Sequence, residues 1–370
     1  MTPLGEHIRR LIRNGETVSL ERFMAIALGD PEHGYYMTRD PFGVDGDFTT
    51  APEISQMFGE LLGLWAAEVW ALMGSPKQIQ LVELGPGRGT LMSDALRALQ
   101  VAGNFAKALT VHLIETSPVL EAQQREILAN SEFKISWHQS LDSVPYGPSI
   151  FLANEFFDAL PVRHYVFQEG AWYEKVIGLD ENDALYYGLA DDPETSIRAR
   201  ADENAVLEVS GLSHRVMAEL AKRVATDRGA ALIIDYGHVE TQFGETLQAL
   251  KSHEPVSPLD EPGEADLTAH VDFAALARTA RAMGASVYGP QRQADFLSKL
   301  GIFERANGLK RQATPRQAIE VDRALLRLVS TAPERGAGGA MVPGMGALFK
   351  VIAITHPDMP QPPGLQSPSK

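Results

Sequence analysis

Short apolar runs alternate with amphipathic segments over the middle of the chain, from residue 76 to about residue 290. The apolar runs predict strands at 79–84, 110–114, 134–138, 150–153, 230–234 and 285–288. Segments between them, such as 90–99, carry apolar residues at helical spacing. This alternation predicts an α/β fold with a mostly parallel sheet covered by helices on both faces. We expect seven strands, the last of them within 347–355.

Segments outside this alternation predict an extension and two insertions. Residues 1–75 are expected to form an N-terminal helical and lid region, and residues 291–346 a helical insertion. A stretch rich in aromatic and β-branched residues predicts an antiparallel insertion at 163–212. The tail, 356–370, is rich in proline and is expected to be disordered. The sheet domain then takes the remaining ranges, 76–162 and 213–290.

The chain is acidic, because 48 Asp and Glu against 33 Lys and Arg give a formal net charge of −15. Such a surface repels phosphate backbones, so no nucleic-acid partner is expected. The absence of cysteine excludes disulfides, thiolate zinc sites and a cysteine nucleophile, and we expect no metal site. We expect no membrane insertion either, since no apolar segment is long enough. A bacterial cytoplasm is the expected location, or a mitochondrial matrix if a transit peptide has been removed.

A glycine turn follows the first strand of the sheet, at 85–89. Glycines at this point let a ligand approach the backbone closely. A dinucleotide fingerprint needs glycine or alanine where this chain has Thr90, and Glu83 would repel a pyrophosphate. Glu83 would instead attract the ammonium and sulfonium of S-adenosylmethionine, whose carboxylate can meet the following helix N-terminus. The turn therefore predicts binding of that cofactor by Glu83, Gly85, Pro86, Gly87, Gly89 and Thr90.

Residues elsewhere in the chain extend this cofactor site. Glu115 ends the second strand, where a carboxylate can accept both ribose hydroxyls. Asp142 follows the third strand and is a candidate for the adenine amino group, the alternative being an ordinary solvated acid. Thr49 and Thr50 lie in a turn-rich stretch that we expect to fold over the cofactor as a lid, the alternative being a structural loop.

A polar segment follows the buried strand at 150–153, where the transferred methyl group is expected. Asn154 supplies an amide there, and Glu155 and Asp158 supply carboxylates. Two aromatic residues between them are candidates for pocket walls. In the alternative interpretation the rings belong to the core, which we expect of one of them, and Asp158 only caps a turn. The two aromatic residues are Phe156 and Phe157.

Several ordered motifs resemble those of the MidA-like methyltransferase family, whose mitochondrial members assist assembly of respiratory complex I. The resemblance runs from the N-terminal helices to the final strand. It rests on the motifs Gly46-Asp-Phe-Thr-Thr-Ala-Pro-Glu, Glu83-Leu-Gly-Pro-Gly-Arg-Gly-Thr-Leu, Asn154-Glu-Phe-Phe-Asp-Ala-Leu-Pro-Val, Asp235-Tyr-Gly-His, Ala265-Asp-Leu-Thr-Ala-His-Val-Asp-Phe and Met345-Gly-Ala-Leu-Phe-Lys-Val.

The resemblance implies a Rossmann-like class I methyltransferase fold and S-adenosyl-L-methionine as cofactor. It also implies methylation of a protein arginine to symmetric dimethylarginine, on the large hydrogenase-like subunit of complex I. A guanidinium must be held and deprotonated before it can act as a nucleophile. Asn154, Glu155 and Asp158 are the catalytic candidates. The candidates for substrate contacts are Phe156, Asp235, Tyr236 and His270.

Two other functions remain compatible with the sequence. One is a methyltransferase that acts on a small molecule, because one fold supports many acceptors. The other is a non-catalytic assembly factor that keeps the cofactor as a structural ligand. Intact acids at Glu83, Glu115 and Glu155 favour an enzyme over that second alternative. A dehydrogenase is disfavoured by Glu83 and Thr90.

Overall fold

A computed structural model describes residues 2–39, 50–335 and 341–366. Its centre is an eight-stranded sheet in which seven strands follow the order β15-β18-β10-β5-β2-β3-β4, and β14 pairs with β10 alone. One more strand is present than the seven expected, because the chain returns beside the end of β10 for two residues. The strands are β2 (Ile79–Leu84), β3 (Leu109–Ile114), β4 (Ile135–His138), β5 (Ser149–Asn154), β10 (Ala230–His238), β14 (Val271–Asp272), β15 (Ser286–Arg292) and β18 (Phe349–Thr355).

The sheet is parallel from β10 through β5, β2 and β3 to β4. Only β18 runs the other way, antiparallel to both β10 and β15. The carboxyl ends of the parallel strands therefore meet at one edge of the sheet, where ligands bind in open α/β folds.

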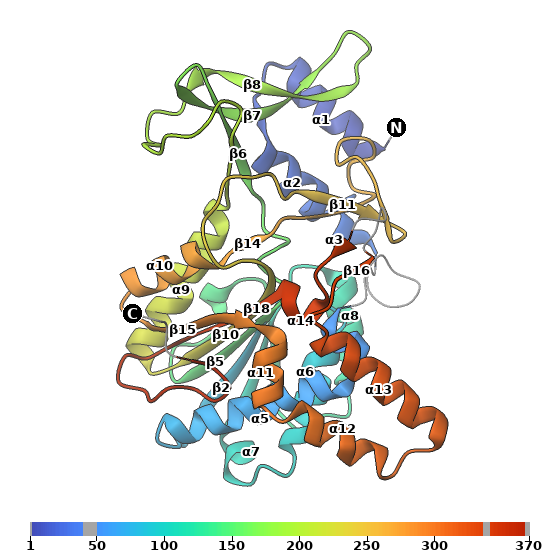
Figure 1. Cartoon of the computed structure of the whole chain (residues 1–370), viewed down its shortest axis with the longest axis vertical. Coiled ribbons are helices and arrows are strands. Elements are labelled where there is room, and N and C mark those ends of the chain that lie inside the picture. Colours follow the sequence, from blue (N-terminus) through green and yellow to red (C-terminus); the bar gives the residue numbers. More distant parts are fainter. Residues whose placement is uncertain (1, 40–49, 336–340, 367–370) are drawn as a thin grey trace.

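Alternate residues of each strand enter two different cores. Leu81 faces one core, and its neighbour Val82 faces the other. The first core contains α5 (Gln56–Leu72) and α6 (Thr90–Leu99), and the second contains α9 (Gly211–Asp227) and α10 (Phe273–Ala282). The sheet is thus covered by helices on both faces (Figure 1). This burial on both sides is why the strands appear in the sequence as continuous apolar runs.

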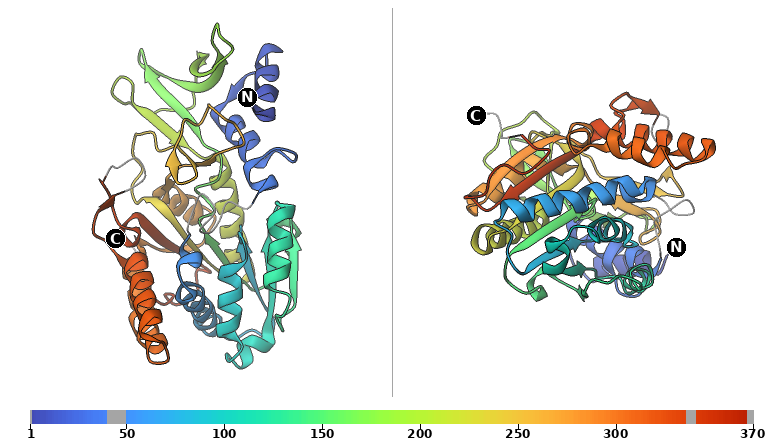
Figure 2. Two further views of the ribbon diagram at one scale, coloured as in Figure 1. Left: turned by 90° about the vertical axis from the view of Figure 1, so that its right-hand side faces the viewer. Right: turned by 90° about the horizontal axis from the view of Figure 1, so that it is seen from below.

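A second, antiparallel sheet stands above the carboxyl edge, in the upper part of Figure 1. It contains β1 (Val18–Ser19), β6 (Arg163–Gln168), β7 (Ala171–Leu179), β8 (Leu185–Pro193) and β9 (Val206–Val209). The N-terminal helices α1 (Pro3–Arg13) and α2 (Leu20–Gly29) pack beside this sheet, as Figure 1 and the left view of Figure 2 show. Helix α2 begins after Ser19, whose hydroxyl accepts a hydrogen bond from the Arg22 amide at 3.2 Å and so caps the helix.

Shorter elements complete the fold. A three-stranded sheet in the loop after β10 contains β11 (Gln248–Lys251), β12 (Glu254–Pro255) and β13 (Asp266–Thr268). The remaining helices are α3 (Tyr35–Thr38), α4 (Ala51–Ile54), α7 (Asn104–Ala108), α8 (Pro118–Ile127), the 3-10 turn Leu141–Ser143, α11 (Gln293–Lys299), α12 (Ile302–Lys310), α13 (Pro315–Val329) and α14 (Met345–Leu348). A short ribbon pairs β16 (Glu334–Arg335) with β17 (Met341–Val342).

The tail differs from the expected disorder as far as it is described, to residue 366. Leu365 is only 3% exposed and belongs to the core that contains α5. The indole of Trp65 donates a hydrogen bond to the Pro363 carbonyl at 3.2 Å, and the Gln291 amide donates to the Gly364 carbonyl at 2.7 Å. Proline-rich composition predicted disorder because it disfavours helices and strands, but an extended segment can still bury its apolar side chains.

No helix among the described residues combines the length and apolar character needed to cross a bilayer.

Candidate active site

A hollow at the carboxyl edge of the main sheet is formed by two adjoining cavities. They share Thr50, Gly85, Gly87 and Glu155. One cavity is further lined by Pro52, Glu53, Glu83, Pro86, Arg88, Thr90, Leu91 and Asn154. The other is lined by Tyr36, Glu115, Thr116, Leu120, Phe156, Asp158, Ala159, Leu160, Tyr236 and Asp266. The hollow therefore contains most of the site residues predicted from the sequence.

The glycine turn has a backbone that only glycine accepts easily. Gly85 has a φ of 60°, and a Cβ there would approach a ring carbon of Phe156 to 2.9 Å. Gly89 has a φ of 87° and precedes α6, so the chain can enter the helix immediately after the turn. The amides at the start of α6 are thereby presented to the cavity.

Glu83 is a buried carboxylate whose Oε2 has no hydrogen-bond partner among the described residues. The side chain is 3% exposed, and burial together with the nearby charge of Glu115 raises its pKa to about 8. Asn154 lines the same cavity and likewise leaves its Oδ1 unpaired within the described chain. Two unpaired acceptors in one buried cavity fit an ammonium group, which brings three donors.

Glu115 is fixed at the end of β3 by several hydrogen bonds. Its Oε1 accepts from the backbone amides of Thr116 at 2.8 Å and Ser117 at 2.7 Å. Its Oε2 accepts from the Gln124 side chain at 3.0 Å. Burial raises the pKa of Glu115, and these donors oppose that effect. Glu115 is therefore held in place at the rim where a ribose is expected.

Gln124 joins the glycine turn to Glu115 and was not predicted from the sequence. Its Nε2 donates to the Gly87 carbonyl at 2.7 Å as well as to Glu115, and its Oε1 accepts from the Trp137 indole at 3.0 Å. It is completely buried. A glutamine on a helix gives no sequence signal for this role, because the partners come from three separate elements.

Glu155 follows β5 with a left-handed backbone, φ 49°. Its Oε1 accepts from the Asn154 amide at 3.0 Å and from the backbone amide of Ala51 at 3.2 Å. Burial, with the charge of Asp158 second, raises its pKa to about 7. Glu155 therefore contacts the segment that includes Thr50, which lines both cavities. The other predicted lid residue, Thr49, lies outside the described residues.

Asp158 and Asp235 have different surroundings. Asp158 lines the cavity at 6% exposure, and its Oδ1 has no partner within the described chain. Burial raises its pKa to about 6, against a hydrogen bond from Tyr236 that lowers it. Asp235 is completely buried, and its carboxylate accepts from the amides of Phe157, Asp158 and Tyr236. Asp235 therefore shapes the turn after β5 and does not line the hollow.

As expected, only one of the two phenylalanines of this turn belongs to the core. Phe156 lines the hollow, whereas Phe157 is buried in the core below and meets Phe156 edge to face at a centroid distance of 5.4 Å. Two other predicted residues do not line it. Asp142 is exposed in the 3-10 turn after β4, and His270 lines a separate cavity behind Tyr236.

Tyr36, Asp266 and Glu53 are among the cavity residues that the sequence reasoning missed. Tyr36, on α3, donates its hydroxyl proton to Asp266 on β13 at 2.7 Å. Glu53 accepts a 2.5 Å hydrogen bond from the Thr90 hydroxyl and so joins α4 to the start of α6. Each pair is far apart in sequence, so spacing could not reveal it. In the described part of the chain, no group of three or more potential ligand side chains could hold a metal.

Comparison with known proteins identifies the family. Residues 61–291 match the model of a family of S-adenosyl-L-methionine-dependent methyltransferases. The chain belongs to this family. Relatives that match over most of its length confirm the resemblance to the MidA-like proteins. A protein of Drosophila melanogaster named "Protein arginine methyltransferase NDUFAF7 homolog, mitochondrial" is 38% identical over 345 residues, covering 84% of this methyltransferase and 78% of the relative. The Homo sapiens protein named "Protein arginine methyltransferase NDUFAF7, mitochondrial" is 37% identical over 331 residues, covering 82% of this methyltransferase and 75% of the relative.

A solved structure supports the fold and the cofactor. A superfamily member from Burkholderia thailandensis, bound to S-adenosyl-homocysteine, superimposes with a TM-score of 0.82 at 27% identity, covering 98% of this methyltransferase and 93% of the other chain. A native structure from the same organism gives 0.78 at 28% identity, covering 95% and 91%. The predicted class I methyltransferase fold and the S-adenosyl-L-methionine cofactor are thus confirmed.

Proposed function

We propose that this methyltransferase modifies an arginine side chain of a protein, giving symmetric dimethylarginine. The relatives named as protein arginine methyltransferases support the acceptor class. The observation that carries the proposal is a group of three carboxylates that line one cavity: the half-buried Glu155 and the buried Asp158 and Asp266. Such a cavity favours a planar cation and disfavours neutral or anionic acceptors.

The large subunit of respiratory complex I, or its bacterial counterpart, is the proposed partner, and modification accompanies assembly. The enzyme would then act where that subunit is assembled, in a bacterial cytoplasm or a mitochondrial matrix. The names of the relatives include the word mitochondrial, which supports the second location.

Residues of the hollow fit three of the cofactor's polar parts: the ammonium, the ribose hydroxyls and the carboxylate. Glu83 and Asn154 present unpaired acceptors for the ammonium. Glu115 stands at the end of β3 for the ribose hydroxyls, and the amides of the turn before α6 can bind the carboxylate. These assignments make Glu83 and Glu115 the residues whose loss weakens cofactor binding most.

Methyl transfer needs a nitrogen lone pair aligned with the methyl group. Bound S-adenosyl-L-methionine supplies that methyl: the new N–C bond forms as the C–S bond breaks, and the sulfur keeps the electron pair. Glu155 and Asp158 hold the guanidinium so that its positive charge lies away from the reacting nitrogen. The nitrogen loses its proton to the carboxylate of Glu155. That group is suited to the role because its pKa, about 7, lies near neutrality.

The test is the variant Glu155→Gln, which keeps the shape of the side chain and removes its charge. We expect the rate of methyl transfer to fall by about 10²-fold or more, with cofactor affinity nearly unchanged. Glu68→Gln, on the exposed side of α5, is the matched control. Mass spectrometry of complex I subunits, from cells with each variant, measures methylation, and calorimetry measures cofactor binding. Wild-type methylation by Glu155→Gln would refute the catalytic assignment.

The same experiment distinguishes the other candidate functions. If the wild-type enzyme leaves every arginine unmodified while complex I still fails to assemble without it, the protein is a scaffold. If assembly is normal and no protein is methylated, a small-molecule acceptor is the correct class. Arginine carrying two methyl groups on one nitrogen would refute the symmetric product.

A further inference from the structure

We propose that Asp266, oriented by Tyr36, binds the non-reacting side of the acceptor guanidinium. This inference rests on the proposed arginine acceptor and assigns part of its recognition to residues outside the methyltransferase sheet. Tyr36 belongs to the N-terminal extension, and Asp266 to the loop between β10 and β14.

The geometry around Asp266 is that of a prepared acceptor. The carboxylate is 4% exposed and lines the same cavity as Glu155 and Asp158. Tyr36 donates to its Oδ1 at 2.7 Å. Burial raises the pKa of Tyr36 well above its usual value, and the negative charges of Asp266 and Asp158 add to this effect. The phenol therefore keeps its proton and remains a hydrogen-bond donor. The pair therefore fixes the carboxylate before a substrate arrives.

A second observation shows that the cavity has unused binding capacity. Asp158 is more than nine-tenths buried, yet its Oδ1 finds no donor among the described residues. A buried carboxylate oxygen without a donor is costly unless a ligand supplies one. A guanidinium carries five N–H donors in one plane, more than Glu155 and Asp158 at the end of β5 can align with at once. The carboxylate of Asp266, on β13, can accept hydrogen bonds from the N–H groups of the guanidinium that face away from Glu155 and Asp158.

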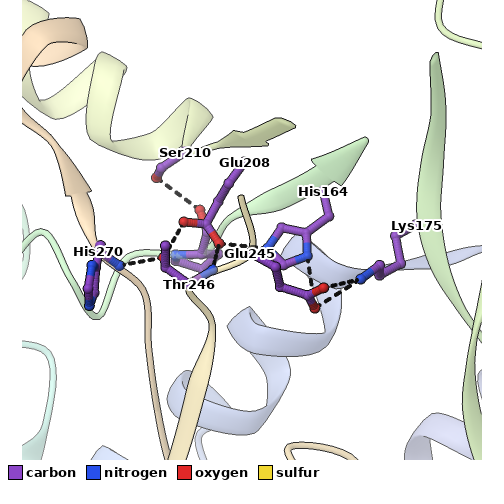
Figure 3. A network of polar contacts seen from close by, with 8 residues as sticks. His164, Lys175, Glu208, Ser210, Glu245, Thr246 and His270 are labelled. Carbon is purple, nitrogen blue, oxygen red and sulfur yellow. Dashed lines mark hydrogen bonds and ion pairs between the residues drawn. The ribbon is translucent and has the colours of Figure 1, made fainter. Parts of the chain in front are cut away.

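The loop that carries Asp266 is anchored by the partly buried polar network in Figure 3. Glu208 on β9 accepts from the Thr246 amide at 3.2 Å and lies 2.7 Å from the imidazole Nε2 of His164. The Thr246 hydroxyl oxygen in turn accepts from the His270 amide at 2.8 Å. One residue thus ties together the two ends of the loop.

The next residues of the loop extend this anchor to Asp266. Glu245 forms an ion pair with Lys175 at 2.9 Å. Leu250 then pairs with Asp266 in the antiparallel ladder of β11 and β13. The carboxylate is therefore part of a small sheet whose base is attached to the antiparallel domain. Such support favours recognition of a fixed, planar ligand over a flexible one.

A binding experiment with a single side chain tests the proposal without a protein substrate. The probe is N-acetyl-arginine amide, and its neutral isostere N-acetyl-citrulline amide is the comparison. Both are titrated by NMR into the full chain saturated with S-adenosyl-homocysteine. We expect the wild type to prefer arginine, and Asp266→Asn to reduce that preference about tenfold, as loss of one charge-assisted pair implies. Tyr36→Phe, which keeps the ring, should reduce it less.

The controls separate this inference from the proposed function. Asp260→Asn changes an exposed acid of the same loop and should leave the preference unchanged. If the wild type prefers arginine and Asp266→Asn and Tyr36→Phe do so equally well, Asp266 does not bind the guanidinium, and the arginine acceptor stands. If the wild type itself binds both probes equally, the arginine acceptor fails and this inference fails with it. Unchanged affinity for S-adenosyl-homocysteine shows that each variant is folded.

Discussion

The substitution Glu83→Gln should stabilise the ligand-free protein at neutral pH and weaken its binding of the cofactor. Burial raises the pKa of Glu83 in the folded chain to about 8, whereas the ordinary pKa of a glutamate is 4.5. A raised pKa means that stability is fully present below the unfolded value and is lost as pH rises through the folded one. At pH 7 the ionisation penalty amounts to about 3.5 kcal/mol, from roughly 2.5 pH units at ~1.4 kcal/mol each. Glutamine has no proton to lose and escapes this penalty.

Urea unfolding of the ligand-free protein, compared between variant and wild type at pH 5 and pH 8, measures the effect. The difference in free energy of unfolding should move by about 3 kcal/mol in favour of the variant between these pH values. Burying the glutamine amide also has a cost in free energy, but this cost is the same at both pH values and therefore cancels when the two differences are compared. Glu68→Gln, at an exposed site, should show no such change. A pH-independent difference for Glu83→Gln would mean that this carboxylate is solvated or paired, and the argument for an empty ammonium site would fail.

The same variant should bind S-adenosyl-homocysteine about 10- to 100-fold more weakly, because a charge-assisted hydrogen bond to the ammonium is lost. The pairing of higher stability with lower affinity is the diagnostic result. A variant that gains stability and keeps full affinity would place the ammonium elsewhere in the hollow.

Two further predictions concern the cofactor rim and the tail. Glu115→Ala should weaken cofactor binding by about 1–3 kcal/mol in calorimetry, since the ribose hydroxyls lose their acceptor, and unchanged affinity would disprove that contact. Leu365→Ala should lower the free energy of unfolding by about 2–5 kcal/mol through the cavity it leaves in the core with α5, whereas a neutral result would show that the tail is not docked in solution.

The sequence predicted the parts of the site that depend on one strand and the turn after it. Strand ends determine where Glu83, Glu115 and Asn154 stand, and apolar runs locate those ends well. The glycine turn is similarly local, since its backbone angles require glycine at known spacing. For these residues, knowing where the strand ends is enough to place the side chain in the site.

Contacts between distant segments could not be predicted in this way. Tyr36 and Asp266 meet only because the N-terminal helices and the loop after β10 pack over the same edge of the sheet. Asp235 was misplaced for a related reason. It ends a strand as the other acids do, but the backbone of the neighbouring turn surrounds it and takes up its carboxylate. Strand-end position alone does not distinguish a ligand-binding acid from one that holds a turn.

The charge of the hollow connects stability, cofactor choice and acceptor choice. Glu83, Glu155 and Asp158 line the two adjoining cavities of the hollow, and loss of solvation raises the pKa of each. Ionising these carboxylates therefore lowers the stability of the ligand-free protein, a cost that would serve no purpose if the three side chains only supported the fold. The ammonium and sulfonium of the cofactor offset part of this cost, and a guanidinium would offset the rest. A pyrophosphate or an anionic acceptor would increase it, so the same carboxylates that destabilise the empty enzyme select its ligands.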